Sequence, residues 1–360
     1  MIKYLGSKRT LVPVLQRLAQ IAAAGSALDL FTGTTRVAQA FKADGIEVIA
    51  NDIASYSKVL ADCYIATDAS SLDLEQLTEV IADLNDTPGI EGYFTETFCR
   101  RSRFFQPKNG RRIDAIRERL EKEFAFSPLR PVLLTALMEA ADRVDSTTGV
   151  QMAYLKSWAP RAYNDLQLRL PQLLVGKGCA LQSDANALLD RPDAPQTDLA
   201  YLDPPYNQHR YFANYHIWET LVRWDAPQTY GVAQKRIDTK DAATKSAFNR
   251  KREMPAALAE VIRNVKCKTL VLSYNNESWV SFEELYQAVA ERFEQATALA
   301  FDSKRYVGAQ IGIYNPAGRR VGQISHLRNL EYVFVGGEAE VIARVRDEFA
   351  DCCVPAPLLV

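Results

Sequence analysis

The chain has 360 residues, of which 48% are hydrophobic and 24% charged, and its formal net charge is −1. A chain of this length is long enough for about two domains with buried cores. The composition is that of a globular protein and excludes a disordered, collagen-like or coiled-coil architecture. Because the net charge is close to zero, any binding of nucleic acid has to depend on local groups of charge.

Cellular location and metal content are predicted from simple patterns. No uninterrupted apolar run reaches the roughly 18 residues of a membrane-spanning helix, and the charged N-terminus has no apolar segment of the kind found in secretory signals. The six cysteines form no C-x-x-C pair and the three histidines are scattered, which argues against structural zinc and predicts that no metal is bound. We therefore expect a cytoplasmic protein with reduced cysteines.

The first third of the chain alternates between helix and strand. Its expected elements are a helix over 11–21, a strand over 27–31, a helix from 37 and a strand over 46–50. A turn at Thr32-Gly33-Thr34 joins the first strand to the second helix, which we expect Thr34 or Thr35 to cap. This order of elements predicts a parallel α/β unit.

Residues 55–178 have a different pattern, which predicts a mostly helical insertion. Its clearest helices are expected over 72–84, 113–126 and 128–143. Strands resume after the insertion and are expected over 180–182, 199–202, 269–274, 296–301 and 332–335. A helical insertion therefore interrupts an α/β sheet.

The strongest chemical motif is Asp203-Pro204-Pro205-Tyr206, which follows the apolar residues 199–202. Open α/β sheets bind ligands beyond the carboxyl ends of their strands. The prolines hold the Asp203 carboxylate and the nearby carbonyls rigidly, and Tyr206 offers a flat face to a planar ring. The carboxylate and a prolyl carbonyl could accept both N–H bonds of an exocyclic amino group, which frees the nitrogen lone pair to attack. A strand-ending turn without a ligand is the alternative for these four residues alone.

A second motif runs from Asp29 to Thr35. Gly33, in a strand-to-helix turn, lets a ligand approach the backbone closely. Asp52 lies 19 residues further on, at the usual place of an acid that binds ribose hydroxyls. Because the G-x-G-x-x-G fingerprint is absent, a nucleoside without phosphates is favoured over a dinucleotide. An ordinary tight turn is the alternative.

The third motif is Lys3-Tyr4-Leu5-Gly6-Ser7-Lys8, in which a lysine beside a glycine turn could hold a ligand carboxylate. A solvated lysine is the alternative if the motif is considered alone. Its value lies in its combination with the other two motifs.

Together the motifs resemble those of the Dam-like DNA adenine-N6 methyltransferases, which use S-adenosylmethionine. The matching residues are Tyr4-Leu5-Gly6-Ser7-Lys8, Asp29-Leu30-Phe31-Thr32-Gly33, Asn51-Asp52, Asp184 and Asp203-Pro204-Pro205-Tyr206. Their order, with an insertion between cofactor and catalytic motifs, is that of the subgroup containing Dam. The aromatic stretch Tyr211–Trp224 resembles a branch associated with restriction–modification systems.

The resemblance implies a Rossmann-like S-adenosylmethionine-dependent methyltransferase sheet with an inserted, mostly helical DNA-recognition domain. Residues 1–54 and 179–360 would form the catalytic domain, and residues 55–178 the target-recognition region. The enzyme would methylate the N6 amino group of adenine in a specific sequence of double-stranded DNA. A cognate restriction endonuclease is a candidate partner.

The resemblance also implies roles for single residues. The catalytic group would be Asp203, Pro204, Pro205 and Tyr206, and the cofactor-binding group Tyr4, Lys8, Asp29, Phe31, Gly33, Asp52 and Asp184. Lys8 would pair with the carboxylate of the cofactor, Asp52 with its ribose hydroxyls and Asp184 with its adenine amino group. The family often has a small residue, commonly glycine, where Thr35 stands, and a β-branched residue allows a less close approach.

DNA contacts are expected from three basic groups, because a target adenine has to leave the duplex while the backbone is held. One of them lies in residues 304–330, which contain no acidic residue, and consists of Lys304, Arg305, Arg319, Arg320 and Arg328. The other two are longer basic stretches. Residues 99–122 contain nine basic and three acidic residues, with Phe98, Phe104 and Phe105 interleaved, and residues 235–252 contain seven basic and two acidic residues. The candidate DNA-binding residues are Arg100, Arg101, Arg103, Lys108, Arg111, Arg112, Lys235, Arg236, Arg250, Lys251 and Arg252.

Two loops are predicted within these basic stretches. Asn109-Gly110 is expected to form a turn whose loop enters a groove, and residues 235–252 are expected to form a mobile loop. A solvated face is the alternative for each stretch.

Two other classes of function compete with this interpretation. A methyltransferase for an RNA adenine or a protein amide more often carries asparagine where Asp203 stands, and lacks a long helical insertion of this kind. A catalytically inactive, DNA-binding methylase fold is disfavoured because Lys8, Asp29, Asp52 and Asp203 are all present.

Overall fold

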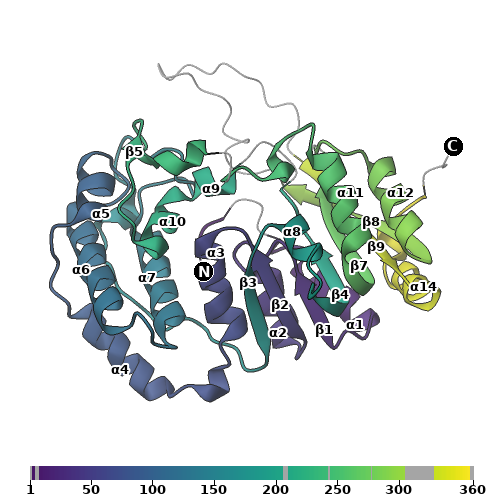
Figure 1. Ribbon diagram of the computed structural model, residues 1–360, viewed down its shortest axis with the longest axis horizontal. Coiled ribbons are helices and arrows are strands. Elements are labelled where there is room, and N and C mark those ends of the chain that lie inside the picture. The colour runs from purple at the N-terminus through teal and green to yellow at the C-terminus, as the bar shows by residue number, and fades with distance from the viewer. Residues whose placement is uncertain are drawn as a thin grey trace. The chain divides into compact units, whose positions relative to one another are not determined.

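The computed structural model describes residues 2–4, 8–205, 210–241, 244–276, 278–304 and 328–356. The chain divides into two compact units. The first contains Met1–Leu5, Thr32–Ser183 and His209–Lys245, and the second contains Gly6–Phe31, Asp184–Gln208 and Ser246–Val360. Both units contain helices and strands (Figure 1), so the fold is α/β, as predicted.

The second unit is built on a sheet in which β10, β8, β9, β7, β4 and β1 lie in that order. The strands are β1 (Ser26–Asp29), β4 (Gln196–Leu202), β7 (Lys266–Asn275), β8 (Gln295–Lys304), β9 (Arg328–Gly337) and β10 (Cys353–Val354). β1, β4 and β7 are parallel, whereas β9 runs antiparallel to β7, and β8 antiparallel to β9. The strands expected at 27–31, 199–202, 269–274, 296–301 and 332–335 are confirmed, each overlapping one of these.

This sheet brings polar side chains together at one edge. Since β1, β4 and β7 are parallel, their carboxyl ends lie at the same edge, with Asp29 ending β1 and Asp203 following β4. Asn275 ends β7 and is paired with Glu331 near the start of β9, because β9 runs in the opposite direction. The register therefore brings the carboxylates of Asp29, Asp203 and Glu331 to the edge where open α/β sheets bind ligands.

Helices pack against this sheet. They are α1 (Val12–Ile21), α8 (Ala185–Leu189), α11 (Met254–Asn264), α12 (Phe282–Arg292) and α14 (Ala339–Glu348). α11 contacts α8 and α12, α12 packs on β8 and β9, and α1 contacts α14. Figure 1 shows α11 and α12 in front of the strands. The sheet is thus packed against helices, as expected for an α/β fold.

The first unit contains a parallel strand pair, the helices of residues 55–178, one α-helix before them and two α-helices after them. β2 (Glu47–Asp52) pairs with β3 (Gly178–Gln182). The helices are α2 (Arg36–Ala43), α3 (Ser55–Ala61), α4 (Leu74–Asn85), α5 (Tyr93–Thr95), α6 (Pro107–Glu123), α7 (Arg130–Val144), α9 (Tyr211–Asn214) and α10 (His216–Arg223). The strands expected at 46–50 and 180–182 and the helices expected at 72–84, 113–126 and 128–143 are confirmed.

Shorter elements complete the first unit. Two π-helical turns, Asp62–Ala66 and Glu96–Arg100, follow α3 and α5. An antiparallel hairpin joins β5 (Thr229–Tyr230) to β6 (Lys235–Arg236), and the 3-10 helix Ile237–Lys240 follows it. Part of the stretch expected to be a mobile loop is therefore regular structure.

The first unit, which contains the helices of residues 55–178 and is called the helical unit below, has an aromatic core. Phe98, Phe104 and Phe105 are at most 1% exposed. Phe98 packs against Phe94 with ring centroids 4.9 Å apart, and Phe105 packs against Trp218 at 6.4 Å. The aromatic residues interleaved with the first basic stretch are therefore core residues, and their rings do not face solvent where a base could stack.

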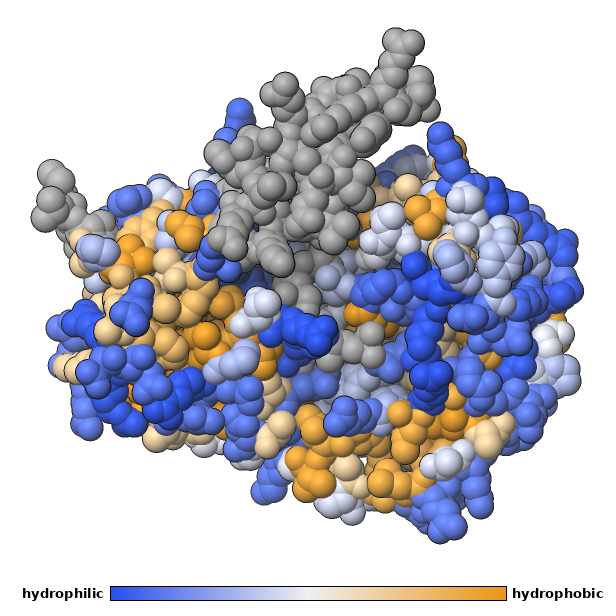
Figure 2. All heavy atoms as spheres, turned by 180° about the vertical axis from the view of Figure 1, so that it is seen from behind, coloured by the Kyte–Doolittle hydropathy of each residue, from blue (hydrophilic) through white to orange (hydrophobic). Residues whose placement is uncertain are grey.

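Within the described residues, none of the helices combines the length and apolarity needed to cross a bilayer. Figure 2 shows hydrophilic side chains interspersed with apolar ones on the face opposite to that of Figure 1.

The turn predicted at Asn109-Gly110 is wrong, because both residues lie in the first turns of α6, which begins at Pro107. Asn109 is buried, its Nδ2 donates to Asn164 O at 2.9 Å, and its Oδ1 accepts from Leu166 N at 2.9 Å. These contacts stabilise a helix where the Asn-Gly pair alone favours a turn. The segment is therefore not a loop that could enter a groove.

Gly110 gives a test of this packing. A Cβ at this position would overlap Cys99 Sγ and stand 3.1 Å from Thr95 Oγ1. Alanine has a helix propensity better than glycine by about 1 kcal/mol, but overpacking a core costs about 1–3 kcal/mol. We expect Gly110→Ala to lower the free energy of unfolding by about 1 kcal/mol in urea denaturation.

The exposed Lys122 of the same helix supplies the control, since Lys122→Ala should change stability by less than about 0.5 kcal/mol. A Gly110→Ala protein as stable as the wild type would contradict the packing described here.

Candidate functional site

Asp203 stands at the end of a buried strand. Leu199, Ala200, Tyr201 and Leu202 of β4 are at most 1% exposed. Pro204 has no N–H to donate and a fixed φ, so the strand ends here. The Asp203 side chain is 20% exposed. A carboxylate is thus held at the edge of the sheet by local sequence, as predicted, whereas Tyr206 lies outside the described residues.

A lysine and a second acid lie beside this carboxylate. Lys8 Nζ is 3.1 Å from Asp203 Oδ1 and donates a hydrogen bond to Glu331 Oε1. All three belong to the second unit. Lys8 and Glu331 are both buried, with 7% and 10% of their side chains exposed. One ammonium therefore lies between two carboxylates at this edge.

Glu331 was not among the residues predicted for the site. The signal for it is weak, a single acid in the strand Leu330–Val335, which is otherwise apolar or aromatic. Its pairing with Asn275 of β7 brings it to the edge where β4 ends.

The surroundings of Asp203 change its acidity. Burial raises the pKa of the carboxyl, Lys8 opposes this, and Glu331 raises it further, to about 6. Tyr201 lies two residues before Asp203 on β4, and its hydroxyl donates to Ser273 Oγ at 3.0 Å. Burial, with the nearby Asp203, raises the pKa of Tyr201 well above its usual value, so this phenol stays protonated.

Asp29 ends β1 in the same unit, and Phe31 follows in the turn after the strand. Asp29 is 1% exposed, and the following residue Leu30 donates its N–H to Tyr201 O at 3.1 Å. The Phe31 ring packs edge-on against Phe248, with centroids 5.0 Å apart. Asp29 is therefore a buried acid on the strand next to that of Asp203.

In the first unit, Asp52 orders the turn around Gly33. Its Oδ2 accepts from Gly33 N at 2.9 Å and its Oδ1 from Ala54 N at 3.0 Å. Burial raises the pKa of this carboxyl, although the backbone N–H groups act against the rise. Each oxygen has further acceptor capacity, so hydroxyl donors of a ligand could still bind.

The turn itself differs from expectation at Thr35. This residue occupies the N-cap position of α2, but the left-handed φ of 62° turns its hydroxyl away from the helix N–H groups. Thr35 Oγ1 instead donates to Thr34 O at 2.6 Å and accepts from Gln39 Nε2 at 2.8 Å. The prediction that Thr34 or Thr35 caps the helix with its side chain is therefore wrong.

Tyr4 lies against this turn. A Cβ on Gly33 would stand 3.2 Å from the Tyr4 ring. The ring stacks on Tyr215 at 4.7 Å and on Tyr211 at 5.2 Å, and its hydroxyl is 3.4 Å from that of Tyr56. The N-terminal motif thus contributes Tyr4 to an aromatic stack of the first unit and Lys8 to the ion pairs of the second.

Asp184 has a clear structural position. Its Oδ1 accepts from Asn186 N at 3.1 Å and from Ala187 N at 3.2 Å, which caps α8. Contact with the adenine amino group of a cofactor remains a prediction for this residue.

The first basic stretch supplies partly exposed cations that are paired within the unit. Arg100 and Arg111 pair with Glu91, Arg101 with Glu96 and Lys108 with Asp165. Arg103 lies over the Trp158 ring at 4.8 Å, and Arg112 donates to Asn85 O. Exposed pairs of this kind are weak and exchange partners readily, so these cations can still contact phosphates.

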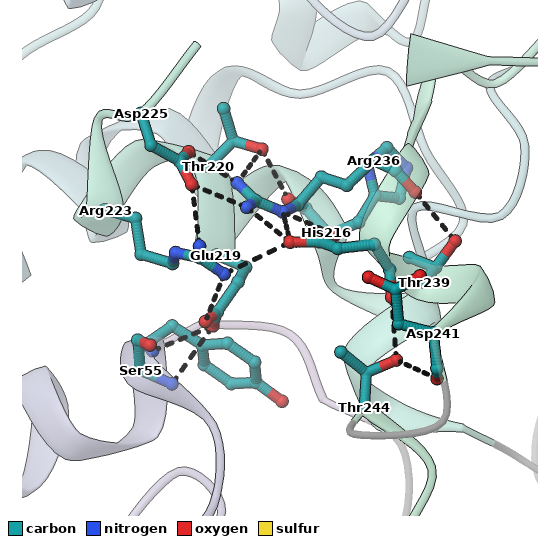
Figure 3. Close-up of polar contacts among 12 residues, drawn as sticks. Ser55, His216, Glu219, Thr220, Arg223, Asp225, Arg236, Thr239, Asp241 and Thr244 are labelled. Atoms are coloured by element: carbon teal, nitrogen blue, oxygen red, sulfur yellow. Dashed lines mark hydrogen bonds and ion pairs between the residues drawn. The ribbon is translucent and has the colours of Figure 1, made fainter. Parts of the chain in front are cut away.

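Arg236 does not suit its predicted role as a phosphate contact. It is 1% exposed and forms two hydrogen bonds of 2.7 Å with the Asp225 carboxylate and one of 2.7 Å with Asp238 (Figure 3). This network joins the β5–β6 hairpin to the end of α10. Of the other candidates in residues 235–252, Lys235 is half-buried, Arg250 pairs with Glu253, and Lys251 and Arg252 are exposed. Of the basic group in residues 304–330, Arg305, Arg319 and Arg320 lie outside the described residues.

Two further buried groups of α10 are structural. Glu219 accepts from Ser55 N at 3.0 Å and from Tyr56 N at 3.3 Å, which satisfies the start of α3 (Figure 3). His216 is fully buried against Gln151 O at 3.0 Å, and burial lowers the pKa of its imidazole to about 3. A neutral imidazole in the core is not placed to act as a base. The described residues include no cluster of three or more potential metal ligands.

Comparison with known proteins gives consistent matches. The family described as D12 class N6 adenine-specific DNA methyltransferase matches residues 4–288. The Type II methyltransferase M.NlaIII of Neisseria lactamica is 31% identical over 288 residues, which cover 77% of this chain and 83% of that protein.

Two longer relatives also match. The modification methylase StsI of Streptococcus sanguinis is 29% identical over 308 residues, 81% of this chain and 46% of that protein. The Type II methyltransferase M.FokI of Planomicrobium okeanokoites is 29% identical over 313 residues, 79% of this chain and 46% of that protein. The chain therefore spans less than half the length of these two relatives.

The Arg236 network can be tested by stability. Removing the guanidinium leaves Asp225 and Asp238 with only the partly exposed Arg223 as a common ion-pair partner, and breaking the buried part of such a network costs about 3 kcal/mol. We expect Arg236→Met to lower the free energy of unfolding by about that amount in urea denaturation followed by tryptophan fluorescence. The control is Arg191→Met, because Arg191 pairs with Asp193 on the surface and should lose less than about 0.5 kcal/mol. Equal losses in the two variants would show that Arg236 is not a structural anchor.

Proposed function

Because the chain belongs to the family of D12 class N6 adenine-specific DNA methyltransferases, we propose that it transfers a methyl group from S-adenosylmethionine to N6 of adenine in DNA. The family match confirms the resemblance predicted from the motifs. The observation that carries the proposal is Asp203, a carboxylate fixed at the end of a buried strand and followed by two prolines.

The chemistry follows from what this carboxylate can accept. The exocyclic amino group of adenine is a poor nucleophile while its lone pair is delocalised into the ring. Asp203 and the Pro204 carbonyl accept its two N–H bonds, which favours tetrahedral geometry and localises the lone pair. The nitrogen then bonds to the methyl carbon while the carbon–sulfur bond breaks and its electron pair stays on sulfur. The methylated nitrogen finally gives its extra proton to water.

The methyl donor supplies an activated methyl group on a sulfonium. The polar groups of the chain suit the rest of the S-adenosylmethionine molecule. Asp52 keeps acceptor capacity for ribose hydroxyls, and Asp29 is a buried acid suited to an ammonium. The proposed cofactor-binding residues are Tyr4, Lys8, Asp29, Phe31, Gly33, Asp52 and Asp184. Lys8 is the cation available for a carboxylate, although it also contacts Asp203 and Glu331.

Binding of DNA is proposed for the helical region. The target adenine leaves the duplex, which costs a few kcal/mol, and phosphate contacts hold the backbone meanwhile. Residues 55–178 are proposed as the target-recognition region and residues 1–54 and 179–360 as the catalytic region. The exposed or partly exposed cations suited to phosphates are Arg100, Arg101, Arg103, Lys108, Arg111, Arg112, Lys235, Arg250, Lys251 and Arg252.

Cellular context is proposed from the relatives, which are named Type II methyltransferases and modification methylases. We propose that the chain acts in the cytoplasm, where it methylates cellular DNA and so protects this DNA from cleavage by a cognate restriction endonuclease.

Asp203→Ala tests the proposal directly. The variant loses the acceptor for the amino group, and we expect methyl transfer to duplex DNA to fall by about 10³-fold, while affinity for S-adenosylmethionine stays within a few-fold. Lys8 keeps Glu331 as its partner, so the fold should survive. The measurement is transfer of labelled methyl to DNA, RNA and protein in parallel, with the modified nucleoside identified by mass spectrometry.

Asp193→Ala is the matched control, because Asp193 is an exposed aspartate paired with Arg191 on the surface. Near-normal transfer by Asp203→Ala, or label found only in RNA or protein, would contradict the proposed function.

Activity should depend on pH through Asp203. The pKa of this carboxyl is raised to about 6, so the acceptor is ionised above that pH and is lost as the pH falls through it. We expect single-turnover rates to fall about tenfold per pH unit below 6, whereas an ordinary aspartate would keep the rate constant down to roughly pH 4. The profile is measured between pH 4.5 and 9, with folding checked by circular dichroism at each point. A constant rate down to the lower end of this range would exclude this role for the Asp203 carboxylate.

A further inference from the structure

One ammonium is placed between two carboxylates in the second unit. Lys8 donates its hydrogen bond to Glu331 and forms an ion pair of 3.1 Å with Asp203. The three side chains are at most 20% exposed. Two negative charges and one positive charge therefore lie close together where few water molecules reach them. The surplus negative charge is unfavourable there, which points to a functional role for it.

The acceptor of Asp203 is not consumed by this arrangement. Its Oδ1 is buried and lies 3.1 Å from Lys8 Nζ, but this contact is an ion pair without hydrogen-bond geometry, so the oxygen accepts no hydrogen bond from the described residues. Since Lys8 donates a hydrogen bond to Glu331 and contacts Asp203 as an ion pair, the Asp203 carboxylate keeps acceptor capacity for another donor.

A purely structural role explains Glu331 poorly. A buried ion pair adds little net stability compared with apolar side chains of similar size. The neighbouring residues of β9 are apolar or aromatic, and Val333, Phe334 and Val335 are fully buried. An apolar residue at position 331 would suit this strand as well.

We propose that Glu331 is a positioning residue for the reaction: it holds the Lys8 ammonium so that Asp203 stays in place with an oxygen free for the amino group of the target base. This inference rests on the proposed function and adds a residue to it. Without the Glu331 charge, Lys8, which already lies 3.1 Å from Asp203 Oδ1, would donate a hydrogen bond to that oxygen and compete with the base for it.

Among the residues that the structure describes, few charged or titratable groups face Asp203, which makes the inference testable by pH. Lys8 lies on the N-terminal segment, Glu331 on β9 and Tyr201 on β4, and Ser273 of β7 is uncharged. Tyr201 stays neutral because burial raises its pKa, and Asp29 is the next acid along the sheet edge. Lys8 and Glu331 therefore act on Asp203 with opposite sign.

Glu331→Gln keeps the shape of the side chain and removes its charge. We expect kcat to fall by up to about 100-fold, with little change in KM for S-adenosylmethionine. The acid limb of the rate profile should move to lower pH by about one unit, because a negative neighbour has been removed. Lys8→Met should move the limb to higher pH. A merely structural role would reduce the rate without moving the limb, and that result would overturn the inference.

The control is Glu340→Gln, an exposed acid in the first turn of α14, which should change neither the rate nor the limb. A shift of the limb in this variant equal to that of Glu331→Gln would mean that overall charge, and not position 331, sets the profile.

A second measurement does not require activity. The carboxyl 13C resonance of Asp203, assigned with Asp203→Asn, should titrate near pH 6 in the wild type, lower in Glu331→Gln and higher in Lys8→Met. An unchanged midpoint in Glu331→Gln would overturn the inference even if the enzyme is active. If the wild type methylates no DNA, the proposed function fails, while this titration still decides whether Glu331 controls Asp203.

Discussion

A buried carboxylate keeps its charge only where a cation or hydrogen-bond donors offset the hydration that it has lost. Asp203 meets this condition through Lys8, and the chemistry proposed for it adds a second requirement. The carboxylate has to be charged and also has to keep a lone pair for the substrate. A lysine paired with Asp203 alone would meet the first requirement at the expense of the second. Glu331 resolves the conflict, because it takes the hydrogen bond of the shared ammonium.

The helical unit uses buried charge differently. Lys42 donates to Ile65 O at 2.8 Å and to Thr67 O at 2.7 Å, and Arg117 donates to Leu221 O at 2.7 Å. Arg236 is enclosed by the carboxylates of Asp225 and Asp238. These cations fix the ends of helices and a hairpin through acceptors of their own unit. Their roles are structural, whereas the second unit holds an acid with an oxygen that makes no hydrogen bond within the described residues.

What could be predicted from the sequence depended on how local the determining interactions are. Asp203 and its prolines follow directly after a strand, so their place at the sheet edge is encoded within a few residues, as are the strands themselves. Glu331 is 323 residues from Lys8, and its place at this edge of the sheet depends on the pairing of β9 with β7. Arg236 looked like its basic neighbours, because composition carries no information on which cation is buried. The Asn109-Gly110 pair favours a turn locally, but contacts with residues 164 and 166 favour the helix.

The turn at Gly33 shows how local hydrogen bonds can offset backbone strain. Gly33 and Thr35 both have left-handed φ values, 51° and 62°. For Thr35 this conformation costs about 1–2 kcal/mol, and the structure compensates with hydrogen bonds from its hydroxyl to Thr34 O and from Gln39 to that hydroxyl. The tight turn directs Gly33 N to Asp52, and the peptide bond between Phe31 and Thr32 joins it to the strand of Asp29. Thr35 is therefore compatible with this turn, because hydrogen bonds of its hydroxyl offset part of the strain of its left-handed conformation.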